Sequence, residues 1–291
     1  MAIVEINRDT CAKCGNCSAV CSWNLIVLRE DNSPGFFPGA DELCIHCGHC
    51  VAICPTGSVR HQDIPVEECT PITKEQEVSF TLTSNLIKNR RSIRIFKDKP
   101  VPRELIESVI DVARYAPTGD NFEEVRWLVI DNKEELNKLS MIAGDAFRLV
   151  SEGKGEPWPY IRYADTVWAE FFKRLPKMAE LGITGNPMDD PVRIITYAES
   201  NNPIAAIDCV IALAYFDLAA KAAGLGCCWA GAFFLAAQSY DPLKVALGIP
   251  EGFKAYGALY VGYPKYTYHR IPVRKPAHIT YLNQKQRSNI S

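Results

Sequence analysis

Residues 11–21 read CAKCGNCSAVC and carry four cysteines in eleven positions. The stretch CIHCGHCVAICP, residues 44–55, repeats this pattern, and each cysteine of the first run lies 33 residues before its counterpart. Both runs have the spacing C-x2-C-x2-C-x3-C, so the N-terminal region contains an internal repeat. The thiols of the repeat are Cys11, Cys14, Cys17, Cys21, Cys44, Cys47, Cys50 and Cys54.

The composition limits the possible functions. A chain of 291 residues exceeds the usual size of one domain, so we expect two domains. The net charge of -2 gives no reason to expect nucleic acid or a membrane as a partner. The opening stretch MAIVEINRDT has no basic region, apolar signal core or cleavage site, so we expect a cytoplasmic protein. Twelve cysteines in that reducing compartment favour metal binding over disulfides.

The spacing of the cysteines also indicates which metal is bound. Thiolates three residues apart allow one short loop to bind three corners of an iron–sulfur cube, while the fourth thiolate points away. Zinc is the alternative, because C-x2-C pairs also form tetrahedral sites, but such pairs are usually separated along the chain. His46 and His49 lie between the cysteines. We interpret them as partly exposed loop residues that at most donate hydrogen bonds to cluster sulfur.

Residues 1–60 resemble a bacterial ferredoxin with two [4Fe-4S] clusters. In these ferredoxins the fourth cysteine of each run ligates the other cluster. The resemblance therefore implies a first cluster bound by Cys11, Cys14, Cys17 and Cys54, and a second bound by Cys44, Cys47, Cys50 and Cys21. Gly15 and Gly48 lie between ligands, where the missing Cβ lets backbone amides approach the sulfides. Pro55 fits the ferredoxin motif, whereas Ser22 replaces the corresponding proline of the first run.

A linker is expected over residues 61–80, because this stretch mixes charged residues, proline and threonine without helical or strand periodicity. It contains Cys69, which we interpret as a free surface thiol. The second domain is expected over residues 81–291. Apolar residues at helical spacing predict an amphipathic helix that begins near Pro102. The sequence VRWLVI, residues 125–130, then predicts a buried strand.

The long apolar stretch over residues 201–226 has the length of a membrane span, but Asp208, Asp217 and Lys221 interrupt it. We therefore predict a buried helix that ends near Gly224. The sequence GLGCCWAG at the end of this stretch follows a helix, whereas a dinucleotide-binding loop must follow a strand, so we exclude a Rossmann site. Packing is the expected role of the nearby thiols of Cys209, Cys227 and Cys228.

Four motifs of the second domain stand in an order that resembles the FMN-dependent nitroreductase family. They are RRSIRIF at residues 90–96, APTGDN at 116–121, GLGCCWAGAF at 224–233 and PVRKP at 272–276. The resemblance covers roughly residues 82–282. It implies an α+β domain whose central sheet is flanked by helices, so the expected fold is α+β, with this domain fused to a small ferredoxin-like domain.

The resemblance also implies site residues. The FMN phosphate and ribityl chain are expected at Arg90, Arg91, Ser92, Arg94 and Arg274. The loop that a partner subunit lays against the flavin ring matches Pro117, Thr118, Gly119 and Asn121. The turn whose backbone N–H faces flavin N5 matches Ala230 and Gly231. Flavin N5 carries the chemistry, so no catalytic side chain is expected. Family members are typically homodimers with flavins at the interface, so we expect a homodimer.

Two features of the sequence bear on the substrate. Many family members carry Gln-Pro-Trp after the position of Asn121, where this chain has FEEVRW, which includes the acids Glu123 and Glu124. Residues 145–195 contain aromatic side chains that form either a lid over an aromatic substrate or a helix packed on protein. We expect packing for most of them and a lid for one or two. They include Trp158, Tyr160, Tyr163, Trp168, Phe171 and Phe172.

The sequence predicts an oxidoreductase in which two [4Fe-4S] clusters pass electrons to FMN and then to a small acceptor, such as a nitroaromatic, quinone or enone. The expected electron donor is a soluble ferredoxin or NAD(P)H. The alternative is a non-catalytic redox sensor or electron-transfer module that acts on a protein partner. No coiled coil, disordered tail or nucleic-acid motif in the sequence marks such a partner. We therefore prefer an enzyme, with neither nucleic acid nor a membrane as partner.

Overall fold

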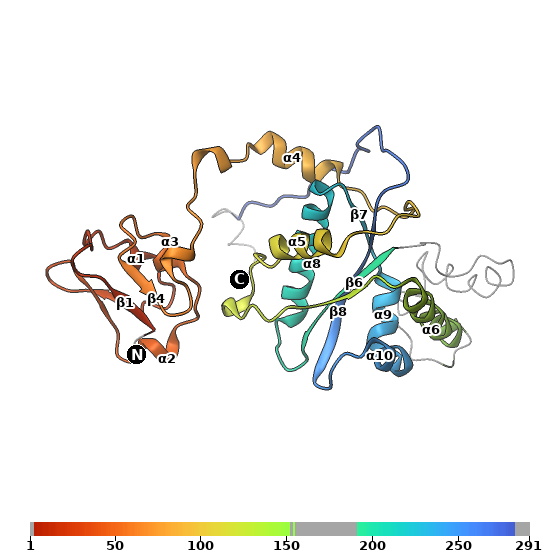
Figure 1. Ribbon diagram of the computed structural model, residues 1–291, viewed down its shortest axis with the longest axis horizontal. Coiled ribbons are helices and arrows are strands. Elements are labelled where there is room, and N and C mark those ends of the chain that lie inside the picture. Colours follow the sequence, from red (N-terminus) through yellow and green to blue (C-terminus); the bar gives the residue numbers. More distant parts are fainter. Residues whose placement is uncertain (1–2, 152–153, 155–190, 283–291) are drawn as a thin grey trace.

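The computed structural model describes residues 3–151, 154 and 191–282. Its N-terminal part consists of short elements, and the remainder is built around a larger sheet (Figure 1). The N-terminal elements are β1 (Val4–Ile6), α1 (Asn16–Val20), β2 (Ile26–Leu28), β3 (Pro34–Phe36), α2 (Ala40–Leu43), α3 (His49–Ala52) and β4 (Val59–His61). Strand β1 pairs antiparallel with β4, and β2 pairs antiparallel with β3.

The two cysteine runs have matching backbone conformations. Gly15 and Gly48 take positive φ values of 77° and 67° and precede α1 and α3, respectively. Lys13 and His46, which also correspond in the repeat, both have φ of 53°. Such values favour glycine, so two glycines at equivalent places allow each run to turn tightly between its cysteines. The internal repeat of the sequence is thus also a repeat of the backbone.

The apolar core of the N-terminal part is small. Its buried residues, within the part of the chain that the structure describes, are Val4, Cys17, Ile26, Val51 and Val59. Ile64 and Val66 also pack against this core, so the packing continues past the domain boundary expected at residue 60. Two short 3-10 turns follow, η1 (Val66–Glu68) and η2 (Lys74–Gln76), before α4 (Phe80–Asn89) begins. The linker over 61–80 therefore contains local turns, and the domain boundaries remain a prediction.

The larger part has an antiparallel sheet in the order β5-β6-β8-β7 within the described residues. The strands are β5 (Arg126–Ile130), β6 (Val192–Glu199), β7 (Gly226–Trp229) and β8 (Phe253–Gly262). The helices packed on one face are α5 (Arg103–Ala113) and α8 (Ala205–Ala222). The helices on the other face are α6 (Lys133–Ser151), α9 (Gly231–Ser239) and α10 (Asp241–Leu247) (Figure 1). These three layers confirm the expected α+β fold.

Alternation along the central strands explains why both faces of the sheet are covered. On β6, Ile194 faces the core of α5 and α8, whereas Ile195 faces the core of α6, α9 and α10. Leu259 and Ala258 on β8 divide between the two cores in the same way. Successive side chains of a strand point to opposite faces, so a strand between two helical layers buries apolar side chains on both of its faces.

The structure confirms the helices predicted for this part and corrects one property of the predicted strand. The amphipathic helix after Pro102 is confirmed as α5, and the long apolar helix is confirmed as α8. The strand VRWLVI is confirmed as β5, but its predicted burial is wrong, because each side chain of β5 is at least partly exposed. Among the described strands, β5 lies at the edge of the sheet and pairs with β6 alone. None of the described helices combines the length and the apolarity that crossing a membrane requires.

An extended segment, residues 92–97, lies against the end of the sheet. Ile93 N–H donates to the Cys227 carbonyl at 2.8 Å, and Lys97 N–H donates to the Tyr263 carbonyl at 2.8 Å. A Cβ on Gly226 would collide with the Ile93 side chain and would lie 3.0 Å from Pro264. The segment therefore approaches β7 closely because residue 226 has no side chain.

We predict that Gly226→Ala destabilises the protein by about 1–3 kcal/mol, because the added methyl group overpacks this contact. Gly144→Ala is the matched control. A Cβ there meets nothing within 4 Å, and the residue lies inside α6, so alanine should stabilise the helix by about 0.5–1 kcal/mol. Denaturant unfolding of both variants measures the difference. Equal stability of the two variants would contradict the close approach.

Candidate functional site

The structure brings the cysteines of the repeat together in two groups. Cys11, Cys14, Cys17 and Cys54 line one cavity, although Cys54 lies far from the others in sequence. In the second group, burial raises the pKa of the Cys44 thiol, and the charges of Cys47 and Cys21 add to the rise. Burial likewise raises the pKa of the Cys50 thiol to about 11, with Cys47 and Cys44 nearby. Each group thus combines three cysteines of one run with the fourth cysteine of the other.

The chemistry of these groups fits a [4Fe-4S] cluster at each. Four thiols converge in each group, and backbone N–H groups already point at sulfur. Lys13 N–H donates to Cys11 Sγ at 3.4 Å, and Leu25 N–H donates to Cys21 Sγ at 3.3 Å. Ser58 N–H donates to Cys54 Sγ at 3.2 Å. Such donors stabilise the negative charge that thiolate ligands carry.

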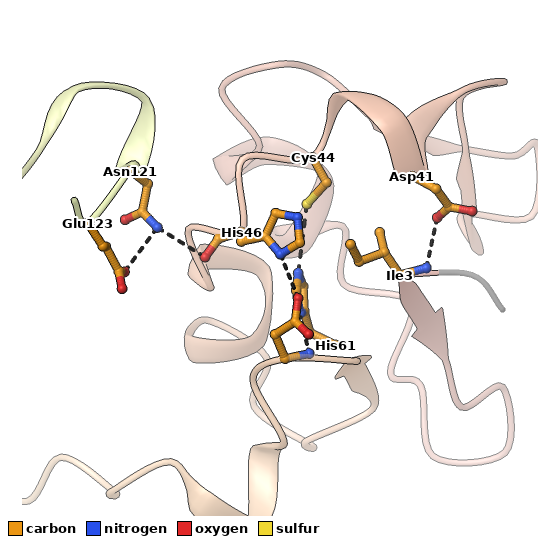
Figure 2. A network of polar contacts seen from close by, with 8 residues as sticks. Ile3, Asp41, Cys44, His46, His61, Asn121 and Glu123 are labelled. Carbon is orange, nitrogen blue, oxygen red and sulfur yellow. Dashed lines mark hydrogen bonds and ion pairs between the residues drawn. The ribbon is translucent and has the colours of Figure 1, made fainter. Parts of the chain in front are cut away.

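A histidine that the sequence analysis did not single out lies beside the second group. His61, at the end of β4, is buried, and its Nε2 lies 3.8 Å from Cys44 Sγ (Figure 2). Burial lowers the pKa of His61, and the nearby His46 lowers it further. His46 is itself exposed, and its Nδ1 lies 2.7 Å from Asp63 Oδ2. No spacing signal in the sequence marks His61, because it contacts Cys44 only through the fold.

The second candidate site is a cavity of about 890 Å³ in the larger part of the chain. Basic side chains dominate its lining, and Asp217 is the only acid among the described residues that line it. The basic residues are Lys88, Arg90, Arg91, Lys97, Lys221 and Arg270. Aromatic side chains also line it, including Tyr263, Tyr266 and Tyr268. A concave, basic and partly aromatic site suits an anionic ligand that carries a ring.

The arginines of the RRSIRIF motif differ in their surroundings. Arg90 follows α4 and forms an ion pair with Asp217 of α8, with Nη1 and Oδ2 separated by 3.2 Å. Burial raises the pKa of the Asp217 carboxyl, and the charge of Arg90 opposes that rise. Arg91 has a buried Nε that finds no hydrogen-bond partner among the described residues. An unpaired buried donor on a cavity wall is costly unless a ligand accepts from it.

Ser92 and Arg94 do not line this cavity. Ser92 forms an isolated parallel β-bridge with Cys227, and Cys227 lines the cavity. Arg94 is exposed. Near the C-terminal end, Arg270 lines the cavity, and Arg274 is exposed and does not. The sequence analysis chose Arg274 from the PVRKP motif and missed Arg270, although YTYHRI places it directly after an aromatic run.

The loop that contains Pro117, Thr118, Gly119 and Asn121 lies away from the basic cavity. The Asp208 carboxylate anchors it, because both carboxylate oxygens lie 3.2 Å from Gly119 N. Asp120, Asn121 and Glu123 take positive φ values of 44°, 56° and 51°, which non-glycine residues adopt rarely. Asn121 Nδ2 donates to the His46 carbonyl at 3.2 Å, so the loop contacts the cysteine-rich part (Figure 2).

The acids that follow this loop accept hydrogen bonds from asparagine side chains. Glu123 accepts from Asn121 Nδ2 at 3.1 Å, and Glu124 accepts from Asn202. Ala230 and Gly231 stand where β7 ends and α9 begins. Ala230 N–H donates to the Ala258 carbonyl at 2.9 Å, whereas Gly231 is the first residue of α9. The first N–H groups of a helix have no acceptor within the helix, so Gly231 can donate to a ligand.

The cysteines outside the repeat are buried in the larger part of the chain, except Cys69. Cys209, Cys227 and Cys228 are buried, and burial raises the pKa of each thiol, to about 12 for Cys209. Cys69 is exposed. The three buried thiols suit packing rather than nucleophilic chemistry, because a thiolate is disfavoured when the pKa is raised in this way. The aromatic residues from Trp158 to Phe172, for which a lid or packing is expected, lie outside the described residues.

Comparison with known proteins identifies both parts of the chain. Residues 87–263 match the Nitroreductase family. Residues 10–58 match the 4Fe-4S dicluster domain, which implies two [4Fe-4S] clusters. The first match covers more than half of the chain, and the second covers the whole cysteine repeat.

Relatives and solved structures agree with these matches. A putative NADH dehydrogenase/NAD(P)H nitroreductase from Archaeoglobus fulgidus is 28% identical over 180 residues, which are 62% of this chain and 84% of the relative. An FMN reductase [NAD(P)H] from Bacillus subtilis is 27% identical over 204 residues, which are 69% of this chain and 74% of the relative. A nitroreductase with bound FMN from Bacteroides fragilis shares the fold with a TM-score of 0.53 and 22% identity, covering 71% of this chain and 100% of that structure. The chain therefore belongs to the nitroreductase family, and it carries a 4Fe-4S dicluster domain before its nitroreductase domain.

Proposed function

We propose that this chain is an FMN-dependent oxidoreductase whose dicluster domain delivers electrons for the reduction of a small acceptor. The observation that carries the proposal is the basic cavity of the nitroreductase domain, on whose wall Arg91 Nε has no hydrogen-bond partner among the described residues. When bound, the clusters supply one-electron transfer and FMN supplies hydride transfer. The family match and the dicluster match support the presence of both kinds of cofactor in one chain.

The thiols of the N-terminal repeat hold the clusters in this proposal. The first set of ligands is Cys11, Cys14, Cys17 and Cys54, and the second is Cys21, Cys44, Cys47 and Cys50. Cluster binding also stabilises the domain, because its apolar core is small and thiolate ligation adds folding free energy. The contact of Asn121 with the His46 carbonyl supports electron transfer from the second set to the nitroreductase domain, since it joins the loop between Cys44 and Cys47 to that domain.

The basic cavity holds the FMN phosphate in this proposal. Arg91 and Arg270 donate to the phosphate oxygens, and Lys88 and Lys221 add positive charge around them. Arg90 stays paired with Asp217, so it fixes the cavity wall more than it contributes free charge. The N–H of Gly231 is the candidate donor toward the flavin ring, as the family resemblance of the CCWAG turn implies.

Exposed apolar residues support a homodimer. Helix α4 buries no residue within the part of the chain that the structure describes, yet Phe80, Leu82 and Ile87 on it are apolar and exposed. The segment after β8 is also exposed, and Val273 and Tyr281 in it are 98% and 78% exposed. Side chains of this kind need a protein surface to cover them, and a second copy of the chain provides one.

The proposal also names classes of electron donor and electron acceptor. The relative from Archaeoglobus fulgidus is named an NAD(P)H nitroreductase and the relative from Bacillus subtilis an NAD(P)H-dependent FMN reductase, which supports NAD(P)H as one possible donor. The fused dicluster domain supports a one-electron donor, such as a soluble ferredoxin, as the other. Nitroaromatics, quinones and enones are the acceptors that we propose to screen. The cluster thiolates and the exposed Cys69 favour the reducing cytoplasm.

We predict that protein purified without oxygen contains about eight irons and one FMN per chain. Cys47→Ser should remove iron from the second set and slow flavin reduction by reduced ferredoxin more than tenfold, whereas reduction by NADH should change little. Cys69→Ser is the matched control, because that thiol is exposed and lies outside both groups. Stopped-flow spectroscopy at the flavin absorption band measures both rates. Full-rate reduction by ferredoxin in Cys47→Ser would rule out the electron route.

A second prediction concerns the phosphate. Arg270→Met should weaken FMN binding roughly 10- to 100-fold, because a charge-assisted hydrogen bond contributes about 1.5–3 kcal/mol. Arg274→Met is the matched control, since it lies four residues further along the same segment but outside the cavity. Titration of deflavinated protein with FMN, followed by the quenching of flavin fluorescence, gives both dissociation constants. A larger loss for Arg274→Met would instead support the motif-based prediction.

A further inference from the structure

His61 differs from the polar residues around it in being enclosed. Its exposed fraction is 4%, whereas His46 and Asp63 are exposed. It stands at the last position of β4, opposite Val4 of β1. Its Nε2 lies 3.8 Å from Cys44 Sγ, within hydrogen-bond range for sulfur. A buried polar ring needs partners, and here one of them is a proposed cluster ligand (Figure 2).

The second ring nitrogen fixes which way the hydrogen bond runs. Asp63 N–H donates to His61 Nδ1 at 3.1 Å. A backbone N–H can only donate, so Nδ1 carries the lone pair and the proton of the neutral ring is on Nε2. His61 therefore donates Nε2–H to Cys44 Sγ. The direction follows from the backbone and not from an assigned hydrogen position.

Neighbouring contacts hold the ring in this orientation. The His46 ring packs edge-on against it, with centroids 5.2 Å apart and planes at 69°. His46 in turn binds Asp63 Oδ2, so Asp63 is held through its side chain while its N–H holds His61. The ligand atoms of these three residues lie within 4.8 Å of one another, which resembles a cation site. However, Nδ1 of His61 already accepts a hydrogen bond and Nε2 carries a proton, so His61 offers no lone pair to a cation.

The first half of the repeat lacks this donor. The 33-residue offset pairs Cys44 with Cys11 and His61 with Leu28, whose side chain has no polar hydrogen. In the first group, the hydroxyl of Thr56 lies 3.7 Å from Cys54 Sγ instead. The two groups of thiols therefore differ in their side-chain donors, although their spacing is the same.

We propose that His61 is a positioning residue that raises the reduction potential of the cluster bound by Cys21, Cys44, Cys47 and Cys50. A hydrogen bond to a ligand sulfur withdraws negative charge, and the reduced cluster carries one more negative charge than the oxidised cluster, so the donor stabilises the reduced form more. The inference rests on the proposed function, because it assumes that clusters bind at the thiols. It assigns different potentials to two clusters that have the same ligand spacing.

The position of the loop beside His61 indicates the direction of electron flow between the two clusters. His46 lies between Cys44 and Cys47, and its carbonyl accepts the hydrogen bond from Asn121 of the nitroreductase domain. The group of thiols next to His61 is therefore also the one whose loop contacts that domain. Electrons that enter at the first cluster then collect at the second, where the contact lies.

The test is an EPR-monitored redox titration of the full-length holoprotein, compared with His61→Leu, which introduces the residue found in the first half. We expect one of the two cluster potentials to fall by about 59 mV, which is a tenfold change in the ratio of reduced to oxidised cluster for a one-electron couple. The other potential should not change. Thr56→Val is the matched control, and it must leave the potential that His61→Leu shifts unchanged.

Three outcomes would overturn the inference: no shift in His61→Leu, an equal shift of both potentials, or a shift of the same potential in Thr56→Val. If His61→Leu fails to retain iron, His61→Phe takes its place, because its ring fills similar space without an N–H donor, so the same fall in one potential is expected and an unchanged potential would overturn the inference. The readout uses cluster potentials without turnover. A failure here therefore differs from a failure of the proposed electron route, which the ferredoxin-driven rates in Cys47→Ser report.

Discussion

The ion pair between Arg90 and Asp217 is the interaction on which the cofactor side of the molecule depends. Asp217 stands on α8, a helix whose other buried positions are mostly apolar, so its carboxylate needs a cation nearby. Arg90 provides that cation from the end of α4, directly before the segment that lies along β7. The pair therefore joins the first helix of the nitroreductase domain to its central helix. The next residue, Arg91, lies on the cavity wall, and its buried Nε has no hydrogen-bond partner in the part of the chain that the structure describes.

The cysteine-rich part depends on a different constraint, which is the antiparallel pairing of β1 with β4. Val4 lies opposite His61 and Ile6 opposite Val59 in this ladder. The pairing closes the chain on itself, and it brings Cys54 to the cavity that Cys11 lines. The same closure buries His61 beside Cys44. A short ladder thus organises both groups of thiols.

Much of this arrangement could be predicted from the sequence, because spacing and periodicity are local properties. The cysteine spacing indicated the cluster thiols, the resemblance to bacterial ferredoxins implied how they group, and the apolar periodicity indicated α5 and α8. The burial of β5 could not be predicted in this way, since the position of a strand within a sheet depends on its neighbours. Arg270 and His61 were missed for the same reason: each reaches its site through the fold, and neither belongs to a repeated motif.

The small apolar core of the N-terminal domain has a consequence for how the protein responds to its supply of iron. With little buried surface of its own, that domain relies on metal–thiolate bonds to remain folded, whereas the nitroreductase domain has two large apolar cores. A chain made under iron starvation would therefore keep a folded flavin domain attached to an unfolded segment that proteases can cut. The abundance of the coupled form would then follow iron availability, with no dedicated sensor needed.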